Sequence, residues 1–455
     1  MDKLSVIRQI GHEIGHISEI IQLFINYQYD AQKNIGQITM NDTLYRIEPT
    51  RLSDVPEAIS DVVAELSAAS AKLETALNPR TAASLAQMVR IMNTYYSNLI
   101  EGHSTRPRDI EQALEHGFDR IGRIPETAQI ESALEGQYSG EPSKRSLLIL
   151  AVAHVRVQEE VDKCYSQHRL AEPASPEFIR WLHREFYRGA TDEMLCIQDN
   201  GQGFLMNPGE WRLRPEHDVA VGRHHPPASD QVARFMTYFA ECYRFDRLGM
   251  AARILAIPAA HHRFNYIHPF PDGNGRVSRL MSHAMGHAAG IGAHGLWSCS
   301  RGLARGLESR GDYKRFLDHA DTPRQGDVDG RGNLSQRAFE DFILWFLRVC
   351  LDQITFMSGL FEINTLASRF KTYVDRSERL KREALPLLQE ALIRGEFDRG
   401  DAPRITRLPE RTARRVLNDI LAEGLLASET PKGPVSLRFP VKTQDILFPR
   451  LFTES

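Results

Sequence analysis

Apolar residues recur every three or four positions through most of the 455-residue chain. This spacing places them on one face of a helix, and enrichment in Ala, Leu and Met favours helices further. The pattern predicts helices over 61–77, 81–102, 143–166, 176–189, 229–248 and 339–363. The predicted fold class is therefore mainly α.

Two stretches interrupt the helical pattern. Residues 38–50 alternate around Asn41-Asp42, which predicts a short hairpin in a small N-terminal extension. Residues 208–228 are rich in Pro, Gly and His and contain the short strand-like pieces WRLR and VAV. Because Pro and Gly interrupt regular structure, we expect this stretch to form an exposed β-hairpin flap.

The C-terminal stretch 371–455 predicts a separate small module. Three helical segments are followed by a hairpin pattern, ASETPKGPVSLRFP, which is the order of a winged helix-turn-helix domain. Arg411, Arg414 and Arg415 fall on one face of the third helix, where they can reach DNA phosphates. The module carries 16 Lys and Arg against 13 Asp and Glu, so docking or dimerisation is as good an interpretation as DNA binding.

The composition is that of a soluble globular protein, with 42% hydrophobic and 25% charged residues. A net charge of −3 gives no overall attraction to nucleic acid or acidic membranes. Five cysteines without a CxxC pair indicate reduced thiols. The first residues lack the apolar stretch of a signal peptide, and the longest apolar run, LLILAVAHV, is too short for a membrane span. We therefore expect a cytoplasmic protein with no membrane partner.

The densest group of reactive side chains lies in IHPFPDGNGRVSRL, residues 267–280. Two prolines and two glycines predict a loop up to Gly275, and good helix formers follow. A glycine-rich turn at a helix start exposes backbone N–H groups at the positive end of the helix dipole, which suits phosphates. Gly273 and Gly275 let the backbone come close to such a ligand, and we expect Asn274 to add a side-chain donor.

The charged residues around this turn suit a nucleotide. Arg276 and Arg279 project from one face of the first helical turn, so two cations can hold a polyphosphate. Asp272 would repel a bare phosphate, and a carboxylate here fits a ligand of Mg²⁺, which bridges phosphate oxygens. His268 has a pKa suited to taking a proton from a hydroxyl group. Together these residues predict nucleotidyl transfer.

The segment HPFPDGNGRVSR matches every position of the Fic motif, H-x-F-x-[DE]-G-N-G-R-x-x-R, and residues 60–365 resemble a Fic protein. The resemblance implies an all-α core that transfers AMP from ATP to a Tyr, Thr or Ser hydroxyl of a target protein, itself included, with release of pyrophosphate. The roles that it implies are a base, His268; an Mg²⁺ ligand, Asp272; and an ATP phosphate site, Gly273, Asn274, Gly275, Arg276 and Arg279.

Two further contacts belong to this interpretation. The flap, around Val219, Ala220 and Val221, would align the target segment by strand addition. The stretch WSCSRGLARGLESRGDY would contribute nucleotide contacts, with Tyr313 as the candidate residue.

The segment SNLIEG, residues 97–102, matches a second Fic pattern, [ST]-x-x-x-E-[GN], which is the inhibitory helix. Ser97 and Glu101 are one helical turn apart and share a face, and Gly102 follows them. A carboxylate delivered to the cleft would pair with Arg279 and deny it to the γ-phosphate. The alternative is an ordinary helix end with a solvated Glu101.

Two other motifs fit their usual roles poorly. HEIGH, residues 12–16, has the histidines and glutamate of a zinc peptidase, but only eleven residues precede it and no third ligand stands out. GIGAHG, residues 290–295, follows a predicted helix rather than a strand, so a helix end explains it better than a dinucleotide site does.

The favoured hypothesis is an autoinhibited protein adenylyltransferase with ATP as substrate and Mg²⁺ as cofactor. The alternatives are a de-AMPylating enzyme in which Glu101 positions water, and a DNA-binding regulator with a sensory Fic core. A homodimer, the target protein and the choice of nucleotide stay open. The expected regions are an N-terminal extension, 1–60; N-terminal helices, 61–175, with the inhibitory helix at about 81–102; the Fic domain, 176–320; connecting helices, 321–370; and the winged-helix module, 371–455.

Overall fold

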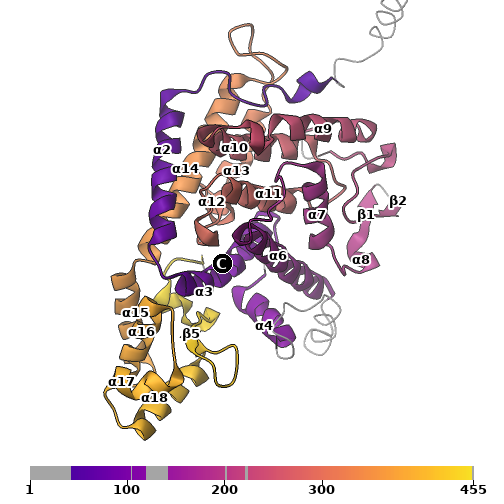
Figure 1. Ribbon diagram of the computed structural model, residues 1–455. Helices are drawn as coiled ribbons and strands as arrows, with labels where there is room; N and C mark the ends of the chain where they lie inside the picture. The colour runs from indigo at the N-terminus through magenta and orange to yellow at the C-terminus, as the bar shows by residue number, and fades with distance from the viewer. Residues whose placement is uncertain (1–42, 104, 119–141, 200–201, 221–223, 453–455) are drawn as a thin grey trace, which may run out of the picture. The chain divides into compact units, whose positions relative to one another are not determined.

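Helices dominate the computed structural model, which describes residues 43–103, 105–118, 142–199, 202–220 and 224–452 (Figure 1). Up to Cys242 the α-helices are α2 (Glu57–Thr75), α3 (Pro79–Ile100), α4 (Pro107–Phe118), α6 (Pro142–Ser166), α7 (Pro176–Phe186), α8 (Asp192–Leu195) and α9 (Val232–Cys242). Those that follow are α10 (Met250–Ile267), α11 (Asn274–Ala288), α12 (Cys299–Arg305), α13 (Asp312–Ala320), α14 (Gln336–Leu360), α15 (Ile363–Arg376), α16 (Leu385–Arg394), α17 (Ala402–Thr406), α18 (Glu410–Glu423) and α19 (Gln444–Leu447). From Ile47 onward the chain forms one unit.

The mainly α fold class and the six predicted helices are confirmed, and local capping explains where several begin. The Asn78 side chain accepts a hydrogen bond from the Arg80 N–H at 2.9 Å, and Pro79 opens α3. Ser175 accepts from the Phe178 N–H at 3.2 Å, and Pro176 opens α7. A capping oxygen satisfies one of the free N–H groups of the first turn, and proline is preset for the first helical position.

The first two strands lie upstream of the predicted flap and not within it. β1 (Cys196–Asp199) and β2 (Gln202–Leu205) form an antiparallel hairpin in which Cys196 lies opposite Leu205. The expected strand WRLR does not form, because the Arg212 N–H donates to the Pro269 carbonyl and a 3₁₀ turn begins at Pro215. Residues 208–220 therefore bind the core as an irregular segment. Val221 lies outside the described residues.

The predicted N-terminal hairpin is also absent where it can be seen. Leu44–Ile47 forms a 3₁₀ turn and not a strand, while residues 38–42 and the HEIGH segment lie outside the described residues. A 3₁₀ turn satisfies its N–H groups locally, so this segment needs no partner strand.

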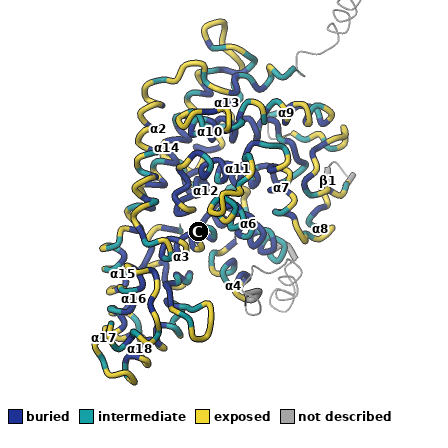
Figure 2. The backbone as a smooth tube through the Cα atoms, viewed as in Figure 1, coloured by how far each residue is buried: buried dark blue, intermediate teal, exposed yellow. Residues whose placement is uncertain are grey.

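The core is built around α10 and α11. Buried residues occur on all sides of α10 between Ile254 and Ile267, as expected for a helix enclosed by others (Figure 2). Helix α14 runs beside α2 (Figure 1). By length and composition α14 could span a membrane, but 56% of its apolar window is buried within the unit, which is typical of a core helix.

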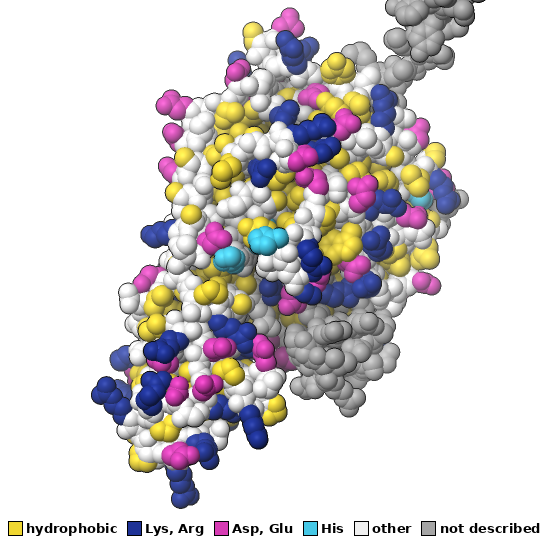
Figure 3. All heavy atoms as spheres, in the orientation of Figure 1, with side chains coloured by type: hydrophobic (Ala, Val, Ile, Leu, Met, Phe, Trp, Pro, Cys, Tyr) yellow, Lys and Arg dark blue, Asp and Glu magenta, His cyan; other side chains and the backbone are white. Residues whose placement is uncertain are grey.

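The C-terminal elements follow the predicted order of three helices and a hairpin. After α16, α17 and α18, strands β4 (Leu426–Ala427) and β5 (Val435–Leu437) pair, and β3 (Glu396–Phe397) completes a sheet of order β3-β5-β4. On the face shown in Figure 3, Lys and Arg are interspersed with Asp and Glu over these elements. A winged-helix assignment and DNA binding stay predictions.

The C-terminal elements are hydrogen-bonded to α3 and α12. The Thr81 hydroxyl donates to the Leu392 carbonyl at 3.1 Å, and the Tyr96 hydroxyl donates to the Leu451 carbonyl at 3.0 Å. Arg301, buried on α12, donates to the carbonyl groups of Arg450 and Leu451 at 2.8 and 3.2 Å. The end of the chain thus packs on the helix that leads to Glu101.

We expect Arg301→Ala to lower the free energy of unfolding by about 3 kcal/mol, since the Arg450 carbonyl and the Gln353 side-chain oxygen lose the donor that Arg301 supplies, and space opens beside Phe356. Urea denaturation measures this difference. Arg305→Ala, at an exposed position of the same helix, is the control and should change the free energy by less than about 0.5 kcal/mol. Equal losses in the two variants would rule out the anchoring role.

Candidate active site

The loop between α10 and α11 is held in one conformation by Asn274. Its Oδ1 accepts from the Phe270 N–H at 2.9 Å, and its Nδ2 donates to the Phe270 carbonyl at 2.8 Å. His268 and Gly273, with φ of 49° and 79°, bracket this closed turn in left-handed conformations. The Asn274 side chain is therefore used within the loop and is not the outward phosphate donor expected from the sequence. Phosphate binding by the backbone N–H groups at the start of α11 stays a prediction.

Asp272 presents a carboxylate beside the start of α11. Its Oδ2 accepts from the Tyr187 hydroxyl at 2.6 Å and from Arg276 Nη2 at 3.4 Å, while its side chain stays 47% exposed. Burial acts to raise the pKa of Asp272, but the Arg276 cation and the Tyr187 hydrogen bond outweigh it and lower the pKa. Asp272 is therefore ionised and partly open to a ligand.

Arg276 is a buried cation with unused donors. It is 5% exposed, and its guanidinium lies 5.0 Å from the centre of the Phe186 ring. Among the described residues, its Nε and Nη1 have no hydrogen-bond partner. Because buried donors are normally satisfied, these two N–H groups fit an anionic ligand.

Arg279 is engaged by the end of α3. Its Nη2 donates to Glu101 Oε1 at 2.6 Å and to the Ser97 carbonyl at 3.1 Å, and its Nε donates to the Ser97 hydroxyl at 2.9 Å. Burial acts to raise the pKa of Glu101, but Arg279 and then Arg276 outweigh it, so the pKa is lowered. The pairing expected from the sequence is present, and both partners are charged.

The Glu101 carboxylate occupies the space over Gly275. A Cβ atom on Gly275 would overlap Glu101 Oε1, so the carboxylate lies against the first turn of α11. Helix α3 ends here because Gly102, with φ of 82°, turns the chain and its N–H donates to the Leu99 carbonyl at 3.1 Å. The helix start predicted to bind an anion thus already faces one from the chain itself.

His268 ends α10 and is held by its backbone. Its N–H donates to the Phe264 carbonyl at 2.9 Å, and its carbonyl accepts from Arg212 Nε at 2.7 Å. Burial, with the nearby Arg212 cation, lowers the pKa of His268 to about 4. The imidazole is neutral near pH 7 and can accept a proton.

Residues 173–285, which contain all of these groups except those of residues 97–102, match the sequence model of the Fic/DOC family. This part of the chain is similar to a Fic/DOC domain. Curated relatives named protein adenylyltransferase Fic, from Drosophila erecta and Drosophila melanogaster, are each 34% identical over 82 residues. That stretch is 18% of this chain and 16% of each relative, so the match spans about a sixth of their length.

Two solved structures are also similar to this chain. A Fic family protein from Desulfovibrio desulfuricans has 17% identity and a TM-score of 0.46, over 84% of this chain and 97% of that one. A Fic domain containing signaling protein from Bacteroides thetaiotaomicron has 17% identity and a TM-score of 0.42, over 66% of this chain and 95% of that one.

His183 of α7 and Tyr187, the residue that follows this helix, position Asp272, and the sequence analysis missed both. His183 Nδ1 accepts from the Gly209 N–H at 2.8 Å, so its Nε2 carries the proton and donates to the Asp272 carbonyl at 3.1 Å. Tyr187, one turn later, holds the carboxylate, and a Cβ on Gly273 would lie 2.9 Å from the Tyr187 ring. The available signal in the sequence was the i, i+4 spacing of two polar aromatic residues at the end of an amphipathic helix.

Arg212 is a third residue that the sequence analysis missed. It is fully buried and donates to the carbonyl groups of Ile267 and His268, which belong to α10 and its end. It also donates to the Pro227 carbonyl at 2.9 Å and to Asp218 Oδ1 at 3.1 Å. Arg212 therefore ties the predicted flap segment to the backbone of His268. Its sequence context, an apparent exposed strand, carried no sign of this.

Tyr313, Val219 and Ala220 are the remaining candidates, and Tyr313 lies close to Arg279. Tyr313 is 6% exposed, and its hydroxyl lies 2.7 Å from His261 Nε2 in the core. Val219 is half-buried and Ala220 exposed in the irregular segment. Nucleotide contact by Tyr313 and target alignment by the flap stay predictions.

The lowered pKa of His268 predicts how stability depends on pH. Below pH 6.5 the unfolded histidine takes up a proton, while folded His268 stays neutral down to about pH 4. Stability present above pH 6.5 is therefore lost as the pH falls toward 4, by up to about 1.4 kcal/mol per pH unit. In urea unfolding at pH 7, 6 and 5, the free energy of unfolding should fall less in His268→Asn than in wild type. The difference should be up to about 1.4 kcal/mol per pH unit. Equal slopes would contradict the assignment.

Proposed function

We propose that this protein is an adenylyltransferase that moves AMP from ATP to a hydroxyl side chain of a target protein, itself included, and that Glu101 restrains it. The observation that carries the proposal is the start of α11, where Arg276 and Arg279 flank a backbone anion site that the chain's own Glu101 covers. The Fic/DOC match and the name of the Drosophila relatives support the same activity.

The phosphates of ATP would take the place next to Gly275. The N–H groups at the start of α11 bind the phosphate oxygens, and the unpartnered Nε and Nη1 of Arg276 supply two further donors. Arg279 reaches the terminal phosphate once Glu101 has left it. These fixed cations stabilise negative charge that develops as the leaving group departs.

Asp272 fits an Mg²⁺ ligand, because it is ionised, partly exposed and held by Tyr187 and Arg276 through one oxygen, Oδ2. When bound, Mg²⁺ neutralises charge on the phosphate oxygens. The hydrogen bonds from Tyr187 and from His183 keep the carboxylate and backbone of Asp272 in position for it.

His268 acts as the general base. Its neutral imidazole takes the proton of the target hydroxyl, whose oxygen attacks the α-phosphorus as the bond from that phosphorus to the leaving oxygen breaks. AMP is then bonded to the target, and pyrophosphate carries away the electron pair. Arg212 fixes the His268 backbone so that the ring keeps its place.

Glu101 restrains this reaction by occupying Arg279. With the ion pair in place, ATP can bind at Arg276, but its terminal phosphate lacks Arg279 and meets a carboxylate. The α-phosphorus is then held out of line with the incoming oxygen. The misalignment therefore lowers the rate of transfer more than it lowers the affinity for ATP.

His268→Ala should lower AMP transfer by about 10²–10⁴-fold and leave ATP binding within a few-fold of wild type, because only the base is removed. Mass spectrometry of the protein after incubation with Mg²⁺ and ATP measures transfer, and isothermal titration measures binding. His261→Ala, which removes a buried histidine of the same helix, is the control for damage to α10. If His268→Ala transfers AMP as fast as wild type, His268 is not the general base.

Glu101→Gly should raise AMP transfer by about one to two orders of magnitude, since a charge-assisted pair is worth about 1.5–3 kcal/mol. Arg279→Ala should show no such gain, because it removes the phosphate anchor together with the partner of Glu101. The double variant should behave as Arg279→Ala alone.

The control for Glu101→Gly is Glu65→Gln, an exposed glutamate of α2 that should leave the rate unchanged. Glu101→Gln keeps the side-chain length and should give a smaller gain than glycine. Equal rates for wild type and Glu101→Gly at saturating ATP would refute the restraint. Loss of AMP from a pre-modified protein in wild type, but not in Glu101→Gly, would instead favour the de-AMPylating alternative.

A further inference from the structure

Asp162 of α6 and two histidines of α11, His283 and His287, bring three ligand atoms to one point. Asp162 Oδ1 lies 2.6 Å from His283 Nε2 and 2.9 Å from His287 Nε2, and the two Nε2 atoms are 3.2 Å apart. The three side chains are 10%, 7% and 1% exposed. None of them belongs to the loop that carries His268 and Asp272.

The three atoms fit a single metal ion without moving. An ion about 1.2 Å above the plane of this triangle would lie about 2.05 Å from all three atoms, within the bond lengths of Zn²⁺ to imidazole nitrogen and carboxylate oxygen. The angles at the ion would be close to 90°, as in a facial set of two histidines and a carboxylate.

The surroundings hold these ligands in place. Arg90 of α3 donates from Nε to the other carboxylate oxygen, Asp162 Oδ2, at 2.8 Å, which turns Oδ1 toward the imidazoles. Tyr165 stacks on the His287 ring at 4.6 Å between centroids. Metal ligands are commonly oriented in this way by hydrogen bonds and packing from the next layer of residues.

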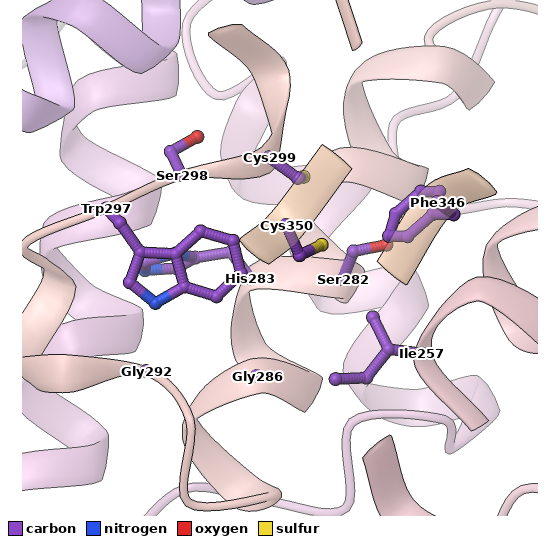
Figure 4. A pocket seen from close by; sticks show the side chains of 10 residues that line it. All are labelled: Ile257, Ser282, His283, Gly286, Gly292, Trp297, Ser298, Cys299, Phe346 and Cys350. Carbon is purple, nitrogen blue, oxygen red and sulfur yellow. The ribbon is translucent and has the colours of Figure 1, made fainter. Parts of the chain in front are cut away.

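The glycines of GIGAHG also pack against this cluster. A Cβ on Gly292 would overlap His287 Nδ1, and one on Gly295 would lie 3.1 Å from Asp162 Oδ2. The close approach of this turn explains two glycines that no dinucleotide site requires. Beside it, His283 lines a small cavity of about 20 Å³ with Trp297 and Cys299, large enough for one water molecule (Figure 4).

We propose that Asp162, His283 and His287 bind a divalent transition-metal ion such as Zn²⁺. Imidazole nitrogens and a carboxylate oxygen are ligands suited to such an ion. The site joins α6 to α11 directly and α3 through Arg90, so it braces the two helices that carry Glu101 and Arg279. The ion would be separate from the Mg²⁺ proposed at Asp272.

The test uses the full chain, stripped with a chelator, reloaded with Zn²⁺ or Co²⁺ and passed through a desalting column. Metal analysis should find about one equivalent per chain in wild type. Bound Co²⁺ should give the visible absorption of nitrogen and oxygen ligands, without the near-ultraviolet band of a thiolate. The melting temperature should rise on reloading.

His287→Gln, His283→Gln and Asp162→Asn should each lower the affinity for Zn²⁺ by at least about 10-fold, and Arg90→Gln should lower it less. His319→Gln alters an exposed histidine–carboxylate pair and should retain the metal. The double variant His12→Ala/His16→Ala should also retain it, which separates this site from HEIGH.

Wild-type protein that keeps no metal after desalting would overturn the proposal, whatever the variants do. So would full retention by the folded triad variants, or loss of the metal only in the His12/His16 variant. Circular dichroism reports whether each variant is folded. Since metal content is read without AMP transfer, failure here leaves the proposed activity standing.

Discussion

The need to satisfy buried guanidinium groups shapes much of this structure. Arg212, Arg263, Arg279 and Arg301 are each at most 1% exposed. Each donates to backbone carbonyls of a segment distant in sequence: the end of α10 for Arg212, Pro49 for Arg263, Ser97 for Arg279 and the last residues for Arg301. A buried cation without partners is costly, so these contacts determine which segments lie together.

Arg279 differs from the others because one of its partners is a side chain that a ligand can replace. Two of its bonds go to Ser97, and the third goes to the Glu101 carboxylate, whose side chain keeps 30% exposure. A phosphate can take over that third bond while the guanidinium stays buried. The neighbouring Arg276 has no such internal partner for Nε and Nη1 in the described part of the chain. One cation is thus covered by an internal carboxylate and the other has unpaired donors, which is the arrangement that the proposed restraint requires.

Helices α3 and α11, which bring Glu101 and Arg279 together, are also linked at a second place through α6. Arg90 precedes Glu101 on α3, and His283 follows Arg279 by one turn on α11, and both reach Asp162 of α6. The ion pair between Glu101 and Arg279 therefore rests on helices that are joined at a second point. A displacement of the whole of α3 relative to α6 would break the Arg90–Asp162 contact as well.

The sequence alone determined the mainly helical fold and the presence of a loop between α10 and α11, because periodicity, glycine and proline act locally. It also indicated that Glu101 and Arg279 meet, through a resemblance and not through spacing. It placed the flap strands wrongly, since Arg212 binds the backbone at Pro269 in place of a partner strand. Only the tertiary structure showed that Asn274 closes the loop, that His183 and Tyr187 hold Asp272, and that Asp162 joins His283 and His287. The partners in these contacts depend on how the helices pack, and a local sequence pattern does not indicate which helices pack together.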